Sequence, residues 1–248
     1  MDFRSLFRAP GSQQAARRSN AAVHRTVGCK QFGHPEFRIQ VDDRAIPAQD
    51  VNWLLRHFEH RVAEGERFRA GETRQIGWML TMIEAGACGF LRVMEPDMKA
   101  IPIKFVDSAD NTLKHLRSQK DVAESIAADR QPDFPSLRQS AVAHVEYKRA
   151  GRVLMTRAAA CDTDSGWSLT DLADEAGSQD PARFVRISLY QLGIDRPDLI
   201  RFLALPPGLQ VVGGDPTIHV MGPEGEIRPA PGSYLDALNK LRARRHVE

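Results

Sequence analysis

The sequence predicts an α+β fold of two small domains, each a mainly antiparallel sheet packed with one or two helices. Its 248 residues fit two units of roughly 100 to 150 residues each. With 42% apolar and 27% charged residues, the composition is that of an ordinary globular protein. Strand-like and helix-like patterns occur on both sides of QPDFPS, residues 131–136, whose two prolines indicate a linker.

The first half predicts a helix, three strands and a second helix. The first helix follows from apolar residues that recur at i, i+3, i+4 and i+7 between an initial proline and a final glycine. The second begins at Ser108 or Asp110, both of which are good capping residues. The predicted elements are a helix from Pro47 to Gly65, a β-hairpin with its turn at 84–89, a strand at 101–106 and a helix within 107–127.

The second half predicts mostly strands. Two of them flank the turn KRAG at 148–151, and a terminal helix capped by Ser233 gathers basic residues at its C-terminal end. The predicted strands are 140–147, 152–160, 166–169, 182–192, 205–213, 217–221 and 225–229, and the predicted helices are 195–205, capped by Asp195, and 233–246.

Charge divides the chain into three predicted regions. Residues 1–30 carry six cations against Asp2 alone, a net of +5, although the whole chain is only +2. This segment has no sustained periodicity, so we predict a flexible basic tail at 1–29. The predicted domains are 30–134 and 136–248.

The composition also indicates the cellular compartment. The three cysteines, Cys29, Cys88 and Cys161, form no CxxC motif, which favours a reducing environment without disulfides. No run has the length of a signal peptide or of a membrane span. We therefore expect a cytoplasmic protein that has no membrane partner.

No strong catalytic pattern occurs. The chain lacks the phosphate-binding, dinucleotide-binding, zinc-protease and serine-nucleophile motifs. Cys29 lies near His34, but at the end of the predicted tail, and the pair His57 and His60 has no third metal ligand at a recognisable spacing. The sequence predicts no catalytic residue, cofactor, metal or small-molecule substrate.

The most unusual stretch is CDTDSGWSLTDLADEAGSQD, residues 161–180, which we call the acidic window. It holds six carboxylates, no Lys or Arg, and a central Trp. Cations from elsewhere in the fold could neutralise it, or it could receive a basic partner, whose approach the charge would accelerate. On the second interpretation the partner-binding residues are Asp162, Asp164, Trp167, Asp171, Asp174, Glu175 and Asp180. For Trp167 a core position, with its indole N–H bonded to a carbonyl, is the simpler interpretation.

Residues 138–215 resemble the bacterial polymorphic-toxin immunity proteins of immunity family thirty-three. The resemblance is carried by a strand–turn–strand start and an acidic run into the D-S-G-W step at 164–167. It continues with Pro197-Asp198-Leu199-Ile200 and the Pro207-Gly208 turn. The stretch SLTDLADEAG departs from the shorter, more aromatic segment expected there.

The resemblance implies a non-enzymatic protein that binds and blocks one toxin, often an effector delivered by type VI secretion. For a cytoplasmic protein the toxin should act in the cytosol, and a nuclease is favoured because its substrate groove is basic. Two alternatives stay open: a nucleic-acid-binding or regulatory protein that uses the basic tail, which the near-neutral body disfavours, and an enzyme with an unrecognised site.

Overall fold

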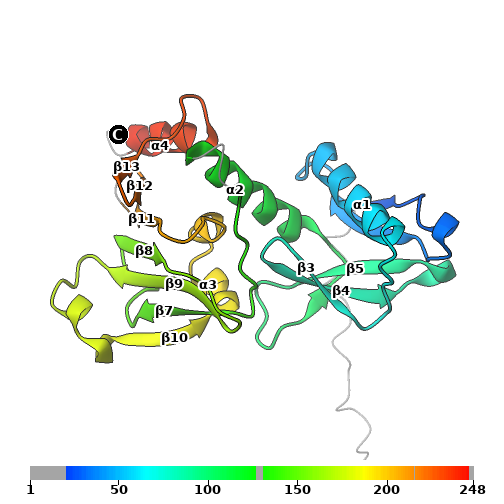
Figure 1. The fold of residues 1–248 in the computed structure, drawn as a ribbon, viewed down its shortest axis with the longest axis horizontal. Coiled ribbons are helices and arrows are strands. Elements are labelled where there is room, and N and C mark those ends of the chain that lie inside the picture. The colour runs from blue at the N-terminus through cyan, green and yellow to red at the C-terminus, as the bar shows by residue number, and fades with distance from the viewer. Residues whose placement is uncertain (1–20, 127–130, 215, 246–248) are drawn as a thin grey trace, which may run out of the picture.

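The computed structural model describes residues 21–126, 131–214 and 216–245. Within these ranges it confirms the α+β class, with two mixed sheets of six and seven strands and four α-helices. The six-stranded sheet belongs to the first half of the chain and the seven-stranded sheet to the second, and Figure 1 shows them side by side. Helix α2 (Asp110–Ile126) runs between them.

The first sheet has the strand order β1-β2-β5-β4-β3, and β6 pairs with β5. Strands β2 and β5 are parallel, and the other neighbours are antiparallel. Helix α1 (Ala48–Ala63) buries the apolar positions that predicted it, including Leu54 and Phe58. The strands are β1 (Ala21–Arg25), β2 (Phe37–Asp42), β3 (Thr73–Ile76), β4 (Met79–Ala85), β5 (Leu91–Pro96) and β6 (Phe105–Val106).

Two predictions in this half have different outcomes. The hairpin is confirmed, because β4 and β5 pair across the predicted turn. The strand predicted at 101–106 shrinks to Phe105–Val106. Pro102 has no N–H to donate to a ladder, and its neighbour Ile101 is 67% exposed in a loop.

The end of the predicted tail is structured. Residues 1–20 lie outside the described ranges, but β1 pairs along its full length with β2. Cys29 is fully buried, and its backbone N–H donates to Glu36 Oε1 at 2.9 Å. Residues 21–29 therefore belong to the first sheet and its core, which corrects the predicted tail boundary at residue 29.

The second sheet has the order β10-β7-β9-β8-β11-β12-β13. Strands β7 and β9 are parallel, and the other neighbours are antiparallel. The strands are β7 (Ser140–His144), β8 (Val153–Arg157), β9 (Asp164–Asp171), β10 (Phe184–Ser188), β11 (Gln210–Gly213), β12 (His219–Gly222) and β13 (Gly225–Ile227).

The strands on either side of KRAG do not pair with each other. Strand β9 lies between them, so the segment 145–152 crosses over β9 and does not close a hairpin. Arg196 holds this crossover through hydrogen bonds from Nη1 to the carbonyl oxygens of Tyr147 and Ala150, at 2.8 and 3.1 Å. The residues of KRAG predicted the turn, but the course of the crossover depends on Arg196, which lies 46 residues after Ala150.

The stretch predicted as one strand over 182–192 changes to a helix midway. Ser188 ends β10 and caps helix α3 (Leu189–Asp195), because its Oγ accepts the Gln191 backbone N–H at 3.0 Å. The helix predicted at 195–205 is reduced to turns that include a 3-10 segment at Ile200–Phe202. The terminal helix is confirmed as α4 (Tyr234–Arg245).

One side chain from the first half completes the core of the second. Trp78, in the β3–β4 turn, is fully buried among residues of α3, β9 and the segment 199–205. Its indole N–H donates to His115 Nδ1 on α2 at 3.1 Å, and its carbonyl accepts the Leu137 N–H at 2.9 Å. Helix α2 itself gives Leu113 and Leu116 to the first core and Val122 and Ala123 to the second. The boundary predicted near residue 135 stays a prediction, because the two cores share these elements.

A buried carboxylate from another strand holds the start of α2. Glu95 of β5 is 1% exposed and accepts the backbone N–H groups of Asn111 and Thr112 at 3.1 and 2.7 Å. Ser108, one of the two predicted caps, accepts the Asp110 N–H at 3.0 Å and donates its hydroxyl to Glu95. Burial raises the Glu95 pKa, while these donors lower it.

Among the described helices, none is both long enough and apolar enough to cross a membrane.

We predict that His115 makes stability depend on pH. Burial, aided by Lys114, lowers the His115 pKa from 6.5 to about 4. Between these values the unfolded chain binds a proton that the folded chain does not, so the free energy of unfolding falls as pH falls, by about 3 kcal/mol in total. Chemical denaturation of His115→Asn, which keeps an acceptor for Trp78, should show a weaker pH dependence. The same substitution at His60, whose side chain is 73% exposed, should leave it unchanged.

Candidate functional site

The acidic window does not form one surface, because a strand divides it. Asp162 precedes β9, Asp164 and Asp171 are its first and last residues, and Asp174, Glu175 and Asp180 follow in the connection to β10. Asp164 and Asp171 are seven steps apart along β9, a distance of about 23 Å at roughly 3.3 Å per residue. The window therefore offers two separate acidic ends.

Asp164 is committed to the fold. Its carboxylate accepts the Gly166 N–H at 2.8 Å and pairs with Arg186 Nη1 of β10 at 2.5 Å. The Gly166 hydrogen bond, followed by Arg186, holds the Asp164 pKa below its usual range. Gly166 has φ +75°, and a Cβ there would stand 2.2 Å from the Ala158 carbonyl oxygen. The D-S-G-W step is thus a close backbone approach that tolerates only glycine.

Trp167 and Asp171 are not on a surface that a partner can reach. Side chains alternate along β9, and both residues point inward, at 1% and 8% exposure. The Trp167 indole N–H donates to the Leu203 carbonyl at 3.0 Å, and the Arg157 guanidinium lies 5.3 Å from the ring centroid. Their assignment as partner-binding residues is wrong, and the core position considered for Trp167 is confirmed.

Asp174 is neutralised within the fold. It accepts the Gly177 N–H at 2.8 Å and pairs with Arg183 at 3.0 Å, and His144 Nε2 lies 3.2 Å away. The Gly177 hydrogen bond is the main cause that holds its pKa low, with Arg183 adding to it. The cations that the sequence window lacks thus come from just beyond its end, from Arg183 in the β9–β10 connection and from Arg186 on β10.

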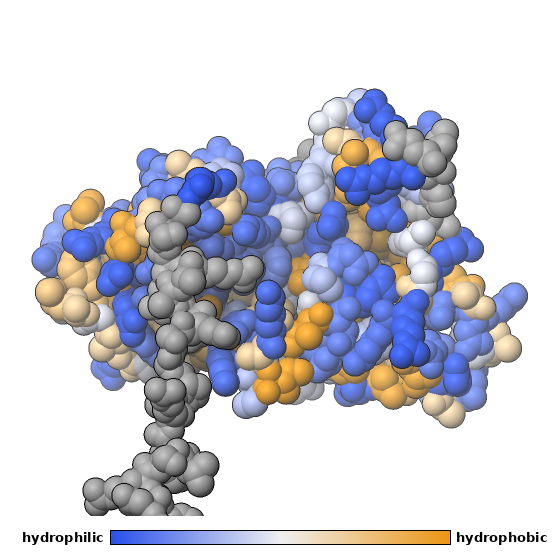
Figure 2. Space-filling view, turned by 180° about the vertical axis from the view of Figure 1, so that it is seen from behind, coloured by the Kyte–Doolittle hydropathy of each residue, from blue (hydrophilic) through white to orange (hydrophobic). Residues whose placement is uncertain are grey.

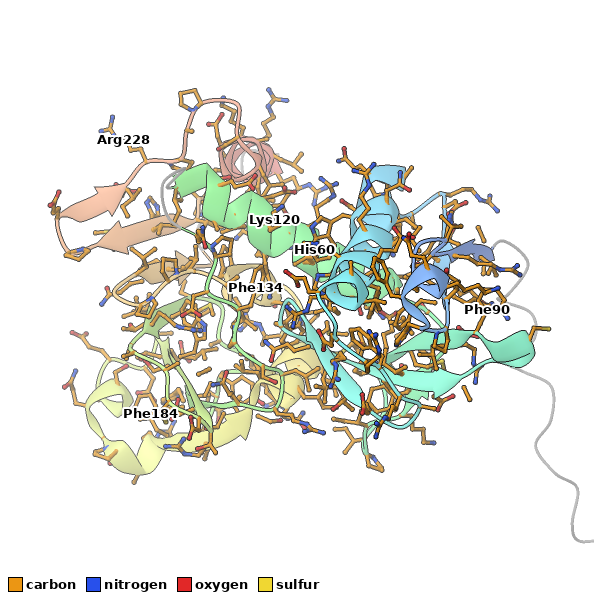
Figure 3. The ribbon with its side chains drawn as sticks, turned by 45° about the vertical axis from the view of Figure 1, so that its right-hand side comes forward. His60, Phe90, Lys120, Phe134, Phe184 and Arg228 are labelled. Atoms are coloured by element: carbon orange, nitrogen blue, oxygen red, sulfur yellow. The ribbon has the colours of Figure 1, made fainter. Side chains whose placement is uncertain are left out.

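Three window carboxylates remain exposed: Asp162, Glu175 and Asp180. Asp180 also accepts the Ala182 N–H at 2.9 Å as the cap of a short 3-10 turn. Glu175 and Asp180 lie in the β9–β10 connection, which projects at the lower left of Figure 1 and which we call the acidic tip (residues 172–183). Phe184, labelled in Figure 3, marks where this connection enters β10.

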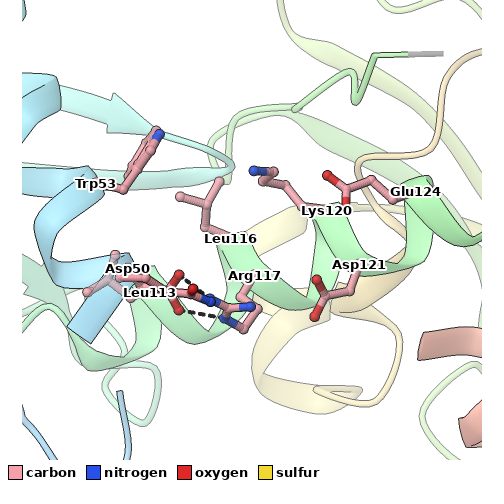
Figure 4. Close-up of a pocket in the computed structure, with 9 residues that line it drawn as sticks. Asp50, Trp53, Leu113, Leu116, Arg117, Lys120, Asp121 and Glu124 are labelled. Carbon is pink, nitrogen blue, oxygen red and sulfur yellow. Dashed lines mark hydrogen bonds and ion pairs between the residues drawn. The ribbon is translucent and has the colours of Figure 1, made fainter. Parts of the chain in front are cut away.

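The best-formed hollow lies between α1 and α2 and has a volume of about 280 Å³ (Figure 4). Asp50 and Arg117 form a two-point ion pair at its base, with Nε to Oδ2 at 2.5 Å, and Trp53, 42% exposed, forms one wall. Burial raises the Asp121 pKa, and the charges of Glu124 and Asp50 add to the increase. Lys120, Asp121 and Glu124 line it, but no Cys, His or Ser does, so it holds no Ser–His or Cys–His pair.

Cys29 is not an activated thiol. Burial raises its pKa to about 11, and the Glu36 charge adds to the increase. His34 is occupied elsewhere: its Nε2 accepts the Phe68 N–H at 3.0 Å, and Nδ1 lies 2.7 Å from the Pro35 carbonyl oxygen. His57 stacks on Trp53 and His60 pairs with Glu64. The described residues contain no cluster of three or more His, Cys, Asp or Glu side chains placed to hold a metal ion.

The surface opposite the view of Figure 1 is mostly hydrophilic, with an apolar patch at the lower middle of Figure 2. The exposed large apolar side chains of the described residues include Ile101 and Ile103 in the β5–β6 loop and Val185 on β10. The Tyr190 hydroxyl holds the start of that loop, 2.7 and 2.6 Å from the carbonyl oxygens of Asp97 and Ala100. The sequence placed Ile101, Ile103 and Val185 in predicted strands and assigned none of them a binding role.

Comparison with known protein families gives a match in the second half of the chain. Residues 118–221, from within α2 to β12, match the model of the Imm33-like domain. No curated protein and no solved structure matches the chain. The matched range contains the whole acidic window and confirms the resemblance to immunity family thirty-three for that part of the chain.

We predict that two neighbouring carboxylates of the window differ in their effect on stability. Asp164→Ala should lower the free energy of unfolding by about 1–2 kcal/mol, because the Gly166 N–H and Arg186 both lose their acceptor. Asp162→Ala should change it by less than about 0.5 kcal/mol, since that side chain is exposed. Urea denaturation monitored by tryptophan fluorescence measures both. Equal effects would contradict the division of the window into structural and free carboxylates.

Proposed function

We propose that this chain, whose residues 118–221 match the model of the Imm33-like domain, is an immunity protein that binds one cognate toxin and blocks it stoichiometrically. The family match carries the proposal, because it covers most of the second sheet. The toxin we favour is a cytosol-acting nuclease delivered by type VI secretion, and the chain itself transforms no substrate.

The charge distribution supports a basic partner at the acidic tip. Asp174 and Arg183 neutralise each other there, whereas Glu175 is exposed and Asp180 is exposed with only a backbone donor. These two carboxylates meet little desolvation cost, so their main effect is on the rate at which a positive surface approaches. A nuclease groove is such a surface, because it must neutralise phosphates.

The fold supports inhibition by contact more than by chemistry. The hollow between α1 and α2 carries an internal ion pair and no Ser–His or Cys–His pair, and Cys29 is buried with a raised pKa. A protein–protein interface needs about 800 Å² from each partner and no reactive group. The second sheet, held on one face by α3 and the segment 199–205, provides a rigid support for such an interface.

We predict that Glu175→Lys slows association with the toxin domain encoded by the adjacent reading frame. The association rate should fall about tenfold at low salt, and the difference from the unaltered chain should shrink as salt rises. Glu224→Lys is the matched control, because Glu224 is an exposed carboxylate of the same domain in the β12–β13 turn. Biolayer interferometry at several salt concentrations measures all three proteins.

The outcomes separate the parts of the proposal. If the unaltered chain does not bind the toxin domain or inhibit it at a one-to-one ratio, the proposed function is wrong. If it binds and both variants associate at its rate, the immunity function stands and the acidic tip is not part of the interface.

A further inference from the structure

Strand β10 is an open edge of the second sheet. It pairs only with β7, and no described element lies beyond it in Figures 1 and 3, where it forms the lower border of that sheet. It directly follows the acidic tip, and Val185 in its middle is 40% exposed.

The register shows which backbone groups of β10 face outward. Val145 donates to the Arg183 carbonyl and Leu189 donates to the Gln139 carbonyl, each at 2.8 Å, so the odd-numbered residues bond to β7. The even-numbered residues therefore point their N–H and C=O groups away from the sheet. The Phe184 N–H is already bonded to the Pro181 carbonyl, and the Ser188 carbonyl enters the first turn of α3.

Four backbone groups remain for an incoming chain: the Phe184 carbonyl, both groups of Arg186 and the Ser188 N–H. Among the described residues no hydrogen bond reaches them. They have the spacing of one antiparallel ladder, with Arg186 in the pair that exchanges two hydrogen bonds. Natural edge strands are often blunted by a charged side chain, proline, a bulge or shortness. Strand β10 carries the charge of Arg186, but it has no proline and its register to β7 is unbroken over five residues. The opposite edge, β13, has three residues and is soon followed by Pro229.

We infer that the toxin adds an extended strand antiparallel to β10, with a neutral residue opposite Arg186 and an apolar residue against Val185. This inference rests on the proposed function and identifies the part of the immunity protein that the toxin contacts. The Arg186 side chain is 61% exposed, but its guanidinium reaches back over β7 to Ser140 and to Asp164 of β9, so its charge is already paired and the position opposite it needs no acidic residue. Backbone pairing would supply affinity, and the charges of the acidic tip would speed the approach.

A second copy of this chain fits the edge less well. Only one antiparallel self-pairing uses all four free groups, and it places Arg186 directly opposite the Arg186 of the other copy. Like charges at directly opposed positions destabilise a strand pair. The registers one step to either side need the Phe184 N–H or the Ser188 carbonyl, which are already bonded.

The test compares Arg186→Pro with Arg186→Ala. Proline removes the outward N–H and sets its ring against the incoming strand, while it leaves the ladder to β7 intact, so the variant should fold. Alanine removes the same side chain and keeps the backbone. We expect Arg186→Pro to bind the adjacent toxin domain about tenfold or more weakly than Arg186→Ala in calorimetry.

Hydrogen exchange on the unaltered chain gives a second measurement that needs no variant. The amides of Arg186 and Ser188 should exchange fast in the free protein and slowly in the complex. If these amides gain no protection and the two variants bind alike, the inference is overturned while toxin binding stands. If the unaltered chain does not bind the toxin domain, the proposed function fails and this inference fails with it.

Discussion

The arrangement of the two halves depends on the burial of Trp78. The residue belongs to the first sheet, but its ring completes the core of the second. Gly193 of α3 makes room for it, since a Cβ there would stand 2.8 Å from the ring. A buried indole must bond its N–H, and His115 on the shared helix α2 accepts it. The ring is held by His115 on one side and packs against Gly193 on the other, and these contacts fix the position of one half relative to the other.

This packing explains why the second sheet has a free border. Helix α3, the segment 199–205, the end of α2 and Leu235 of α4 all gather on one face of the sheet, together with Trp78. The apolar side chains of β8 and β9 point to that face, as the alternation of buried positions shows. No described helix is left for the β10 border, so its backbone groups meet solvent or a partner.

The carboxylates of the acidic window have two different roles. Asp164 and Asp174 hold turns and pair with arginines, whereas Glu175 and Asp180 remain at the surface. Arg186 takes part in both features, because it neutralises Asp164 and also belongs to the open edge strand β10. On this surface, paired carboxylates stabilise the turns and unpaired carboxylates stay exposed at the acidic tip. That arrangement suits an inhibitor that acts by contact.

Patterns of neighbouring residues predicted much of this protein: the α+β class, helices α1, α2 and α4, and the β4–β5 hairpin. These follow from periodicity, capping and backbone sterics, which act over a few residues. The placement of β9 between β7 and β8 came only from tertiary structure, as did the Glu95 cap of α2. Each depends on contacts between residues distant in sequence, and so does the identity of the carboxylates that stay free. The sequence shows that the window is rich in carboxylates, but only the fold shows that Arg183 pairs with Asp174 and Arg186 with Asp164.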